Sequence, residues 1–104
     1  MAMFEKEKNR LVTRSVESEV PIAIQVLIWN FIDELRKKRQ SEMDYLQVFQ
    51  LTVQDGVQEI INTQEEPLKE DSIKVTLPKN LMLTTRIWII DDGNYSTMLF
   101  PFDY

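Results

Sequence analysis

Neither cysteine nor histidine occurs among the 104 residues of the chain. Without cysteine there can be no disulfide bond, thiolate nucleophile or sulfur-ligated metal. Histidine is the usual general base near neutral pH and the commonest metal ligand, so its absence excludes Ser-His-Asp catalysis and ordinary zinc sites. Carboxylate, lysine and tyrosine chemistry remains open. The composition therefore predicts that the chain is not an enzyme and has no catalytic residues, cofactor or metal.

Glycine is also scarce, with Gly56 and Gly93 alone, which excludes a glycine-rich phosphate loop. Asp91, Asp92 and Asn94 around Gly93 offer oxygen ligands to a divalent cation. An EF-hand loop, however, spaces its ligands over about twelve residues and closes with a glutamate. Asp-Gly pairs are also what a tight hairpin turn requires, so a turn is the favoured interpretation.

No apolar run is long enough to span a bilayer, which takes about 20 mainly apolar residues. The longest, Val20 to Leu35, is interrupted by polar residues such as Gln25 and Asp33. The stretch from Phe4 to Arg10 is too charged for the apolar core of a secretion signal. We expect a cytoplasmic protein without a membrane partner.

The net charge of −5 is unevenly placed. Residues 1–40 carry eight basic and six acidic side chains, whereas residues 41–104 carry four basic and eleven acidic ones, for balances of +2 and −7. An acidic chain argues against direct nucleic-acid binding, which needs several cations on phosphates. The alternatives are an acidic surface that serves solubility and an acidic face that meets a basic protein partner.

A long amphipathic helix is predicted over residues 21–39. Pro21 suits a first helical turn, where its missing N–H costs nothing. Apolar residues recur at the spacing of one helical face. These residues are Ile24, Leu27, Ile28, Phe31, Ile32 and Leu35.

A basic run, Arg36, Lys37, Lys38 and Arg39, closes this helix. Cations at a helix C-terminus complement the negative end of its dipole, so capping and solubility are the favoured interpretation. The alternative is a basic contact with a nucleic acid or an acidic protein, in an accessory or regulatory role.

The rest of the pattern predicts strands. Alternating or β-branched residues mark strands over 10–16, 45–54, 57–63, 86–91 and 95–100, and the alternation of Ile73, Val75 and Leu77 leaves a short edge strand as an option over 73–77. Asp55-Gly56 and Asp92-Gly93 predict hairpin turns, and the acidic stretch 64–71 an exposed loop. Residues 64–85 are the segment whose path the pattern defines least.

The prediction is one α+β domain, residues 1–104, with one long helix packed on a mainly antiparallel sheet of four or five strands. The expected core is Ile24, Leu27, Ile28, Phe31, Ile32, Leu35, Phe49, Leu51, Trp88 and Ile90.

Two blocks of sequence carry a family resemblance. They comprise Thr13-Arg14-Ser15-Val16, Glu19-Val20-Pro21, Leu27-Ile28-Trp29, Ile32-Asp33 and Asp44 to Phe49, and then Ile90 to Leu99 near the end. Together they resemble a small bacterial family known as domain of unknown function 960. The resemblance implies a Gram-positive source and brings no enzymatic activity. It also implies an association with mobile elements, where small acidic inhibitors of uracil-DNA glycosylase are encoded nearby.

The segment Tyr95 to Asp103 is also similar to a strand of the phage inhibitor of uracil-DNA glycosylase, with Ser96 and Pro101 at the same separation. The function expected from the sequence is a non-catalytic, acidic protein-binding module. Its most specific version is a DNA-mimic inhibitor of a DNA-handling enzyme such as uracil-DNA glycosylase. Carboxylates would replace phosphates, and apolar side chains would fill the pocket for a flipped base. The expected contact residues are Asp91, Asp92, Met98, Phe100 and Asp103.

Overall fold

The fold is seen in a computed structural model that describes residues 3–5 and 9–104. Residues 1–2 and 6–8, which include part of the charged N-terminal stretch, lie outside the described residues. The elements in chain order are β1 (Asn9–Val12), α1 (Arg14–Glu19), α2 (Ile22–Arg39), β2 (Leu46–Gln54), β3 (Val57–Glu65), β4 (Leu68–Val75), β5 (Thr85–Asp91) and β6 (Tyr95–Leu99). Short 3₁₀ turns follow α2 (Gln40–Glu42), precede β5 (Lys79–Leu81) and end the chain (Pro101–Asp103).

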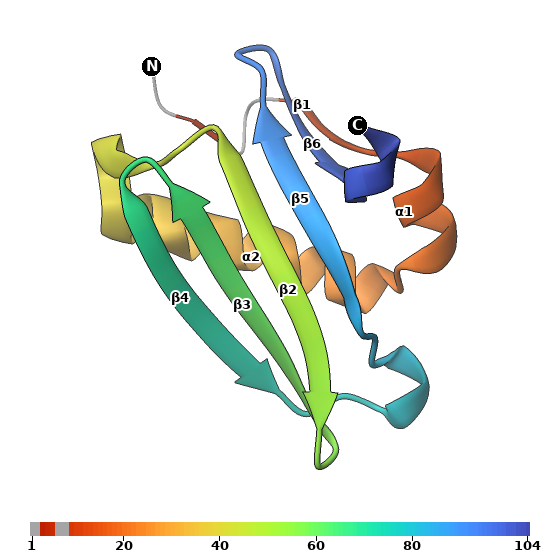
Figure 1. The fold of residues 1–104 in the computed structure, drawn as a ribbon. Coiled ribbons are helices and arrows are strands. Elements are labelled where there is room, and N and C mark those ends of the chain that lie inside the picture. Colours follow the sequence, from red (N-terminus) through yellow and green to blue (C-terminus); the bar gives the residue numbers. More distant parts are fainter. Residues whose placement is uncertain (1–2, 6–8) are drawn as a thin grey trace.

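The strands form one six-stranded sheet in the order β1-β6-β5-β2-β3-β4, and α2 crosses one of its faces (Figure 1). The α+β class and the single long helix are confirmed. The expected number of four or five strands is wrong, because both β1 and the longer β4 join the sheet. The sheet is also mixed, since β1 pairs parallel with β6 while the other neighbours are antiparallel. No described helix is both long and apolar enough to cross a membrane.

Two segments depart from their predicted structure. The strand expected over residues 10–16 ends at Val12, because Thr13 caps a short helix by accepting a hydrogen bond from the N–H of Val16 at 3.3 Å. The loop expected over residues 64–71 is a tight turn at Glu66-Pro67 between β3 and β4. The acidic residues of that stretch tolerate a strand because β4 lies at the sheet edge, where half of its side chains remain exposed.

The first predicted hairpin is confirmed. Gln54 pairs with Val57 across the turn, and Asp55 and Gly56 have φ values of 53° and 76°. Positive φ at both central residues is what a two-residue type I′ turn requires, and Asp-Gly supplies it with little strain. This tight closure sets the register of β2 against β3, which pair from Gln54 with Val57 to Val48 with Thr63.

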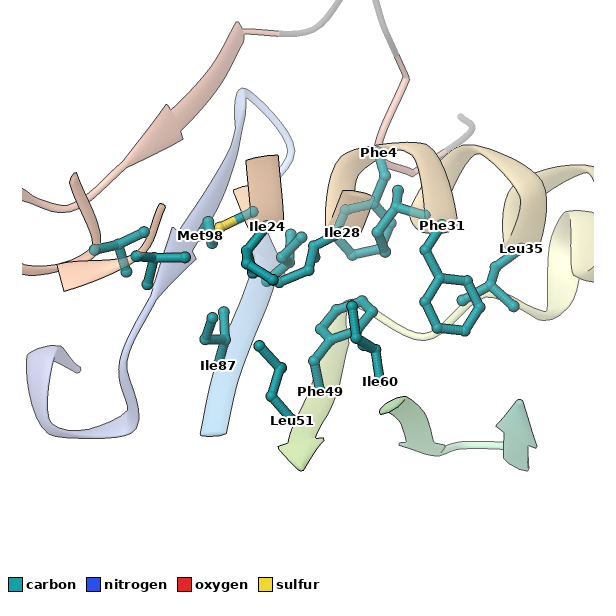
Figure 2. Close-up of a cluster of buried hydrophobic side chains, with 14 of the residues drawn as sticks. Phe4, Ile24, Ile28, Phe31, Leu35, Phe49, Leu51, Ile60, Ile87 and Met98 are labelled. Atoms are coloured by element: carbon teal, nitrogen blue, oxygen red, sulfur yellow. The ribbon is translucent and has the colours of Figure 1, made fainter. Parts of the chain in front are cut away.

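The core lies between α2 and the sheet face that it covers (Figure 2). Ile28 and Ile32 of α2 meet Phe49 and Leu51 of β2 there, all without exposed surface. The predicted helix face is confirmed apart from Leu27, which is partly buried beside the cluster. Two core assignments are wrong. Trp88 and Ile90 are half-buried on the other face of β5, and the core residues of that strand are Ile87 and Ile89.

Candidate functional site: the open face of the sheet

The face of the sheet that α2 leaves uncovered carries a group of half-buried apolar side chains. Leu46 lies opposite Ile90, and Val48 lies opposite Trp88, across the paired strands β2 and β5. Ile61 of β3 continues the group on the same face. We call Leu46, Val48, Ile61, Trp88 and Ile90 the open-face patch. Contiguous apolar side chains left at a surface commonly mark a binding site.

Trp88 has one contact on this face that comes from the end of the chain. The rings of Trp88 and Tyr104 meet edge to face, with centroids 5.9 Å apart. Tyr104 itself remains 86% exposed. The two rings thus form an aromatic anchor at one side of the open-face patch, of the kind enriched where proteins bind other proteins.

Carboxylates border the other side of the patch. A hollow of about 300 Å³ has Leu46, Val48 and Leu68 among its apolar lining residues, and Asp44, Glu65 and Glu66 among its acidic ones. We call these three carboxylates and their apolar floor the acidic corner. Asp44 is fixed by the N–H groups of Tyr45 and Glu66, which donate to its two carboxylate oxygens at 2.8 and 3.0 Å.

An acidic rim over an apolar floor suits one kind of side chain. Lysine and arginine lay their aliphatic stems on apolar surface while the charged head remains at a polar edge. The acidic corner has this combination of surfaces beside the open-face patch. The arrangement can therefore hold a basic side chain of a partner whose apolar side chains cover the patch.

Two of the residues expected to contact a partner, Asp91 and Asp92, accept hydrogen bonds within the β5–β6 turn. Asp91 is buried and accepts hydrogen bonds from the N–H groups of Phe4 and Gly93 at 2.7 and 2.8 Å. Asp92 is exposed, and its Oδ1 accepts from the N–H groups of Asn94 and Tyr95. The favoured turn interpretation is confirmed, and Asp91 has too little exposed surface to imitate a DNA phosphate.

The expected apolar contacts, Met98 and Phe100, lie inside the molecule. Met98 has no exposed surface, and Phe100 is 5% exposed. The expectation that they enter a partner's pocket is wrong for this conformation. The reason is the pairing of Ile89 with Met98, which points Met98 toward α2 rather than outward (Figure 2).

Asp103 stabilises the C-terminal turn against α1. Burial opposes ionisation of its carboxyl, but three hydrogen bonds outweigh this effect and hold its pKa below the ordinary value. The hydroxyls of Thr13 and Ser15 each donate to it at 2.8 Å, and the N–H of Phe100 donates at 3.0 Å. These bonds give Asp103 a structural role that its place near the end of the sequence does not reveal.

The basic run at the end of α2 is engaged within the chain. Arg36, Lys37 and Lys38 form ion pairs with Asp33, Glu34 and Asp71, respectively. The fourth member, Arg39, is only 5% exposed and therefore cannot contribute to a basic contact surface, contrary to that alternative. Lys37 and Lys38 retain exposed side chains.

Arg39 belongs to a buried polar group that the sequence did not reveal. Its guanidinium donates to the amide oxygens of Gln47, Asn62 and Gln64 and to the carboxylate of Asp71. Gln47 and Asn62 lie in predicted strands, where alternating polar residues ordinarily indicate a solvated face, and Gln64 lies in the stretch predicted as a loop. One signal was present, since Asn62 and Gln64 share the parity of the buried Ile60.

The open-face patch was also missed, although β5 carried a signal for it. Ile87, Trp88, Ile89 and Ile90 are apolar without alternation. A strand that is apolar on both faces predicts that both faces are covered by something. In the structure α2 covers one of them and leaves the second, with Trp88 and Ile90, half-buried.

Comparisons with known proteins place the chain among relatives without an assigned activity. A family model described as "Staphylococcal protein of unknown function (DUF960)" matches residues 9–103. A crystal structure described as a protein of unknown function from Enterococcus faecalis is similar over 100% of this chain and 97% of that one, with a TM-score of 0.85 and 26% sequence identity. The search of curated proteins found no match.

Proposed function

We propose that this chain, which belongs to the family described as staphylococcal protein of unknown function (DUF960), is a non-catalytic module that binds another protein through the open face of its sheet. The observation that carries the proposal is the open-face patch, five half-buried apolar side chains on the face opposite α2. Burying apolar surface of this kind stabilises a complex by about 25 cal/mol per Å² before the costs of association.

The chemistry of the partner follows from the border of the patch. Asp44, Glu65 and Glu66 give the acidic corner a negative charge next to its apolar floor. A partner with apolar side chains and an adjacent lysine or arginine complements both features. Such charge complementarity mainly speeds association, while the apolar contacts slow release.

The test compares capture of host proteins by matched variants. Val48→Asp places a charge within the open-face patch, and Val26→Asp places the same charge on α2, where Val26 is already 50% exposed. We expect a staphylococcal lysate to yield a protein that the wild type and Val26→Asp retain and that Val48→Asp loses. If every captured protein binds all three forms equally, the open face is not the binding surface. Circular dichroism of the variants checks that they are folded.

A second candidate is the DNA-mimic inhibitor of an enzyme such as uracil-DNA glycosylase, now with different contact residues. The observation that favours it is the acidic corner, because clustered carboxylates beside an apolar surface resemble phosphates beside bases. We expect an excess of the chain to inhibit cleavage of uracil-containing DNA, and Glu65→Gln with Glu66→Gln to weaken the inhibition. Unchanged glycosylase activity would exclude this enzyme as the target and leave the protein-binding proposal standing.

A further inference from the structure

Strand β4 lies at one edge of the sheet, where it pairs with β3 alone among the described residues (Figure 1). An edge strand presents a row of N–H and C=O groups that can pair with another strand. β4 has eight residues, whereas β1 at the opposite edge has four. The longer edge can therefore form an extended ladder with a strand from another molecule.

Charges along β4 are arranged symmetrically about one residue. Glu70, Ser72 and Lys74 point to the open face and are exposed, and the two opposite charges lie two positions on either side of the serine. We propose that β4 pairs antiparallel with β4 of a second copy of this chain, about a two-fold axis that passes at Ser72. Glu70 of each copy then lies directly opposite Lys74 of the other.

Other registers lack this complementarity. Sliding one strand by two residues sets Glu70 or Lys74 opposite Ser72 and removes both ion pairs. Sliding it by four sets Glu70 opposite Glu70, or Lys74 opposite Lys74, and like charges directly opposite destabilise a sheet. Charged residues, lysine above all, ordinarily protect an edge against pairing. In the proposed register each lysine instead meets a glutamate, so the same charges favour one partner and one alignment.

The helix side of the same edge is also suited to a second copy. A two-fold axis perpendicular to the sheet keeps both α2 helices on one side of the joined sheet, so the surfaces beside the two β4 strands face each other. A groove of about 430 Å³ lies there between α2 and β4. Its apolar lining residues are Leu27, Phe31, Leu35 and Ile73.

The remaining charges on the helix side of β4 do not oppose the pairing. Lys69 forms an ion pair with Glu42 at 2.9 Å, and Asp71 pairs with Lys38 and Arg39. Because Lys69 and Asp71 each already have an oppositely charged partner within the chain, a second copy would not meet either of them unpaired. Joining the edges would cover apolar surface on the helix side and form ion pairs on the open face.

The absence of native cysteine allows a direct test of the axis. Residues opposite each other in an antiparallel pair have Cα atoms about 4.5–5.5 Å apart, which suits a disulfide. We expect Ser72→Cys to form a cross-linked dimer under mild oxidation. Glu70→Cys is the matched control, since its two copies would lie roughly 14 Å apart and remain unlinked. Equal cross-linking of both variants, or of neither, would overturn the proposed register.

Charge exchange tests the interface itself. Sedimentation at about 100 μM should give the wild type roughly twice the single-chain mass of 12.4 kDa. Glu70→Lys alone and Lys74→Glu alone should each weaken self-association about tenfold or more, because each sets like charges opposite each other twice. A mixture of the two variants should restore the dimer, since every opposing pair is then Lys with Glu. A monomeric wild type, or a mixture no more associated than its components, would refute the proposal.

This inference does not depend on the proposed function. Val48→Asp alters the open-face patch and should leave the β4 dimer unchanged, whereas Glu70→Lys should leave partner capture through the patch unchanged. If one of the two surfaces has been assigned wrongly, only the predictions for the variants of that surface fail, and the predictions for the other surface are unaffected.

Discussion

Neighbouring residues of β5 face opposite ways and meet different surroundings. Ile87 and Ile89 lie beneath α2 without exposed surface, while Trp88 and Ile90 lie half-buried on the open face. All four are large and apolar, so residue type alone does not distinguish the two pairs. We call the sheet face beneath α2 the closed face. The chain's own helix covers it, and the packing of α2 against this face stabilises the monomer. The open face keeps apolar surface that the monomer does not bury, which is the basis of the proposed binding role.

The largest expected loss of stability comes from truncating an isoleucine of β5 beneath α2, and the same truncation on the open face is its control. Ile89→Ala should reduce the free energy of unfolding by about 2–5 kcal/mol, because it leaves a cavity in a closed core. Ile90→Ala removes the same atoms from a half-buried position and should cost about 1 kcal/mol or less. Urea unfolding monitored by circular dichroism measures both values. Equal losses would mean that the open face is as tightly covered as the closed one.

The closed face is apolar at its centre and has a buried polar cluster around Arg39 at one end of α2. Arg39→Met should lower stability by roughly 2–4 kcal/mol, because buried amide groups and Asp71 lose hydrogen bonds that water does not replace. Lys37→Met is the matched control from the same helical turn, and its exposed ion pair contributes about 0–1 kcal/mol. The same unfolding measurement applies, and similar small losses in both variants would show that the cluster contributes little.

A smaller effect is the pH dependence of stability that Asp71 contributes at the edge of the closed face. The hydrogen bond from Lys38 is the largest cause that holds the pKa of Asp71 below its ordinary value, with Arg39 acting in the same direction and burial against it. A folded-state pKa below the unfolded one contributes stability above the unfolded value, near 4. That contribution is lost as the pH falls through the folded value.

Melting temperatures recorded from pH 7 down to pH 2 test this linkage. Asp71→Asn should lower the melting temperature at pH 7, and the gap from the wild type should narrow as the pH falls below about 4. A gap that stays constant over the range would show that ionisation of Asp71 does not stabilise the fold. Glu34→Gln, on an exposed helix position with a 3.3 Å ion pair to Lys37, is a control expected to shift little.

Short sequence patterns predicted those elements that form because of interactions between residues close together in the chain. The spacing of Ile24, Ile28 and Ile32 predicts α2 because one helical turn sets it. Asp55-Gly56 predicts the first hairpin because positive φ is a property of the residues themselves. The pattern failed at Thr13, where a cap ends the strand, and at residues 64–71, where the sheet edge accommodates acidic side chains.

The candidate site could not be predicted in the same way. Met98 and Phe100 have the composition of contact residues, yet strand register and packing place them inside. The sequence shows that Asp91 and Asp103 carry carboxylates, but only the structure shows that hydrogen bonds from within the chain engage them. The burial and the hydrogen bonds of these side chains depend on residues far away along the chain. No short segment of sequence therefore shows which of them are accessible to a partner.

By itself, the sequence determined the absence of cysteine and histidine chemistry, the long helix, the first hairpin and the α+β class, since these follow from composition and from periods of a few residues. Only the tertiary structure decided which face of β5 lies beneath α2, because both faces are apolar and the choice depends on where the helix packs. It also decided that Arg39 is enclosed among Gln47, Asn62 and Gln64, residues that look exposed until β2 and β3 bring them together around one guanidinium.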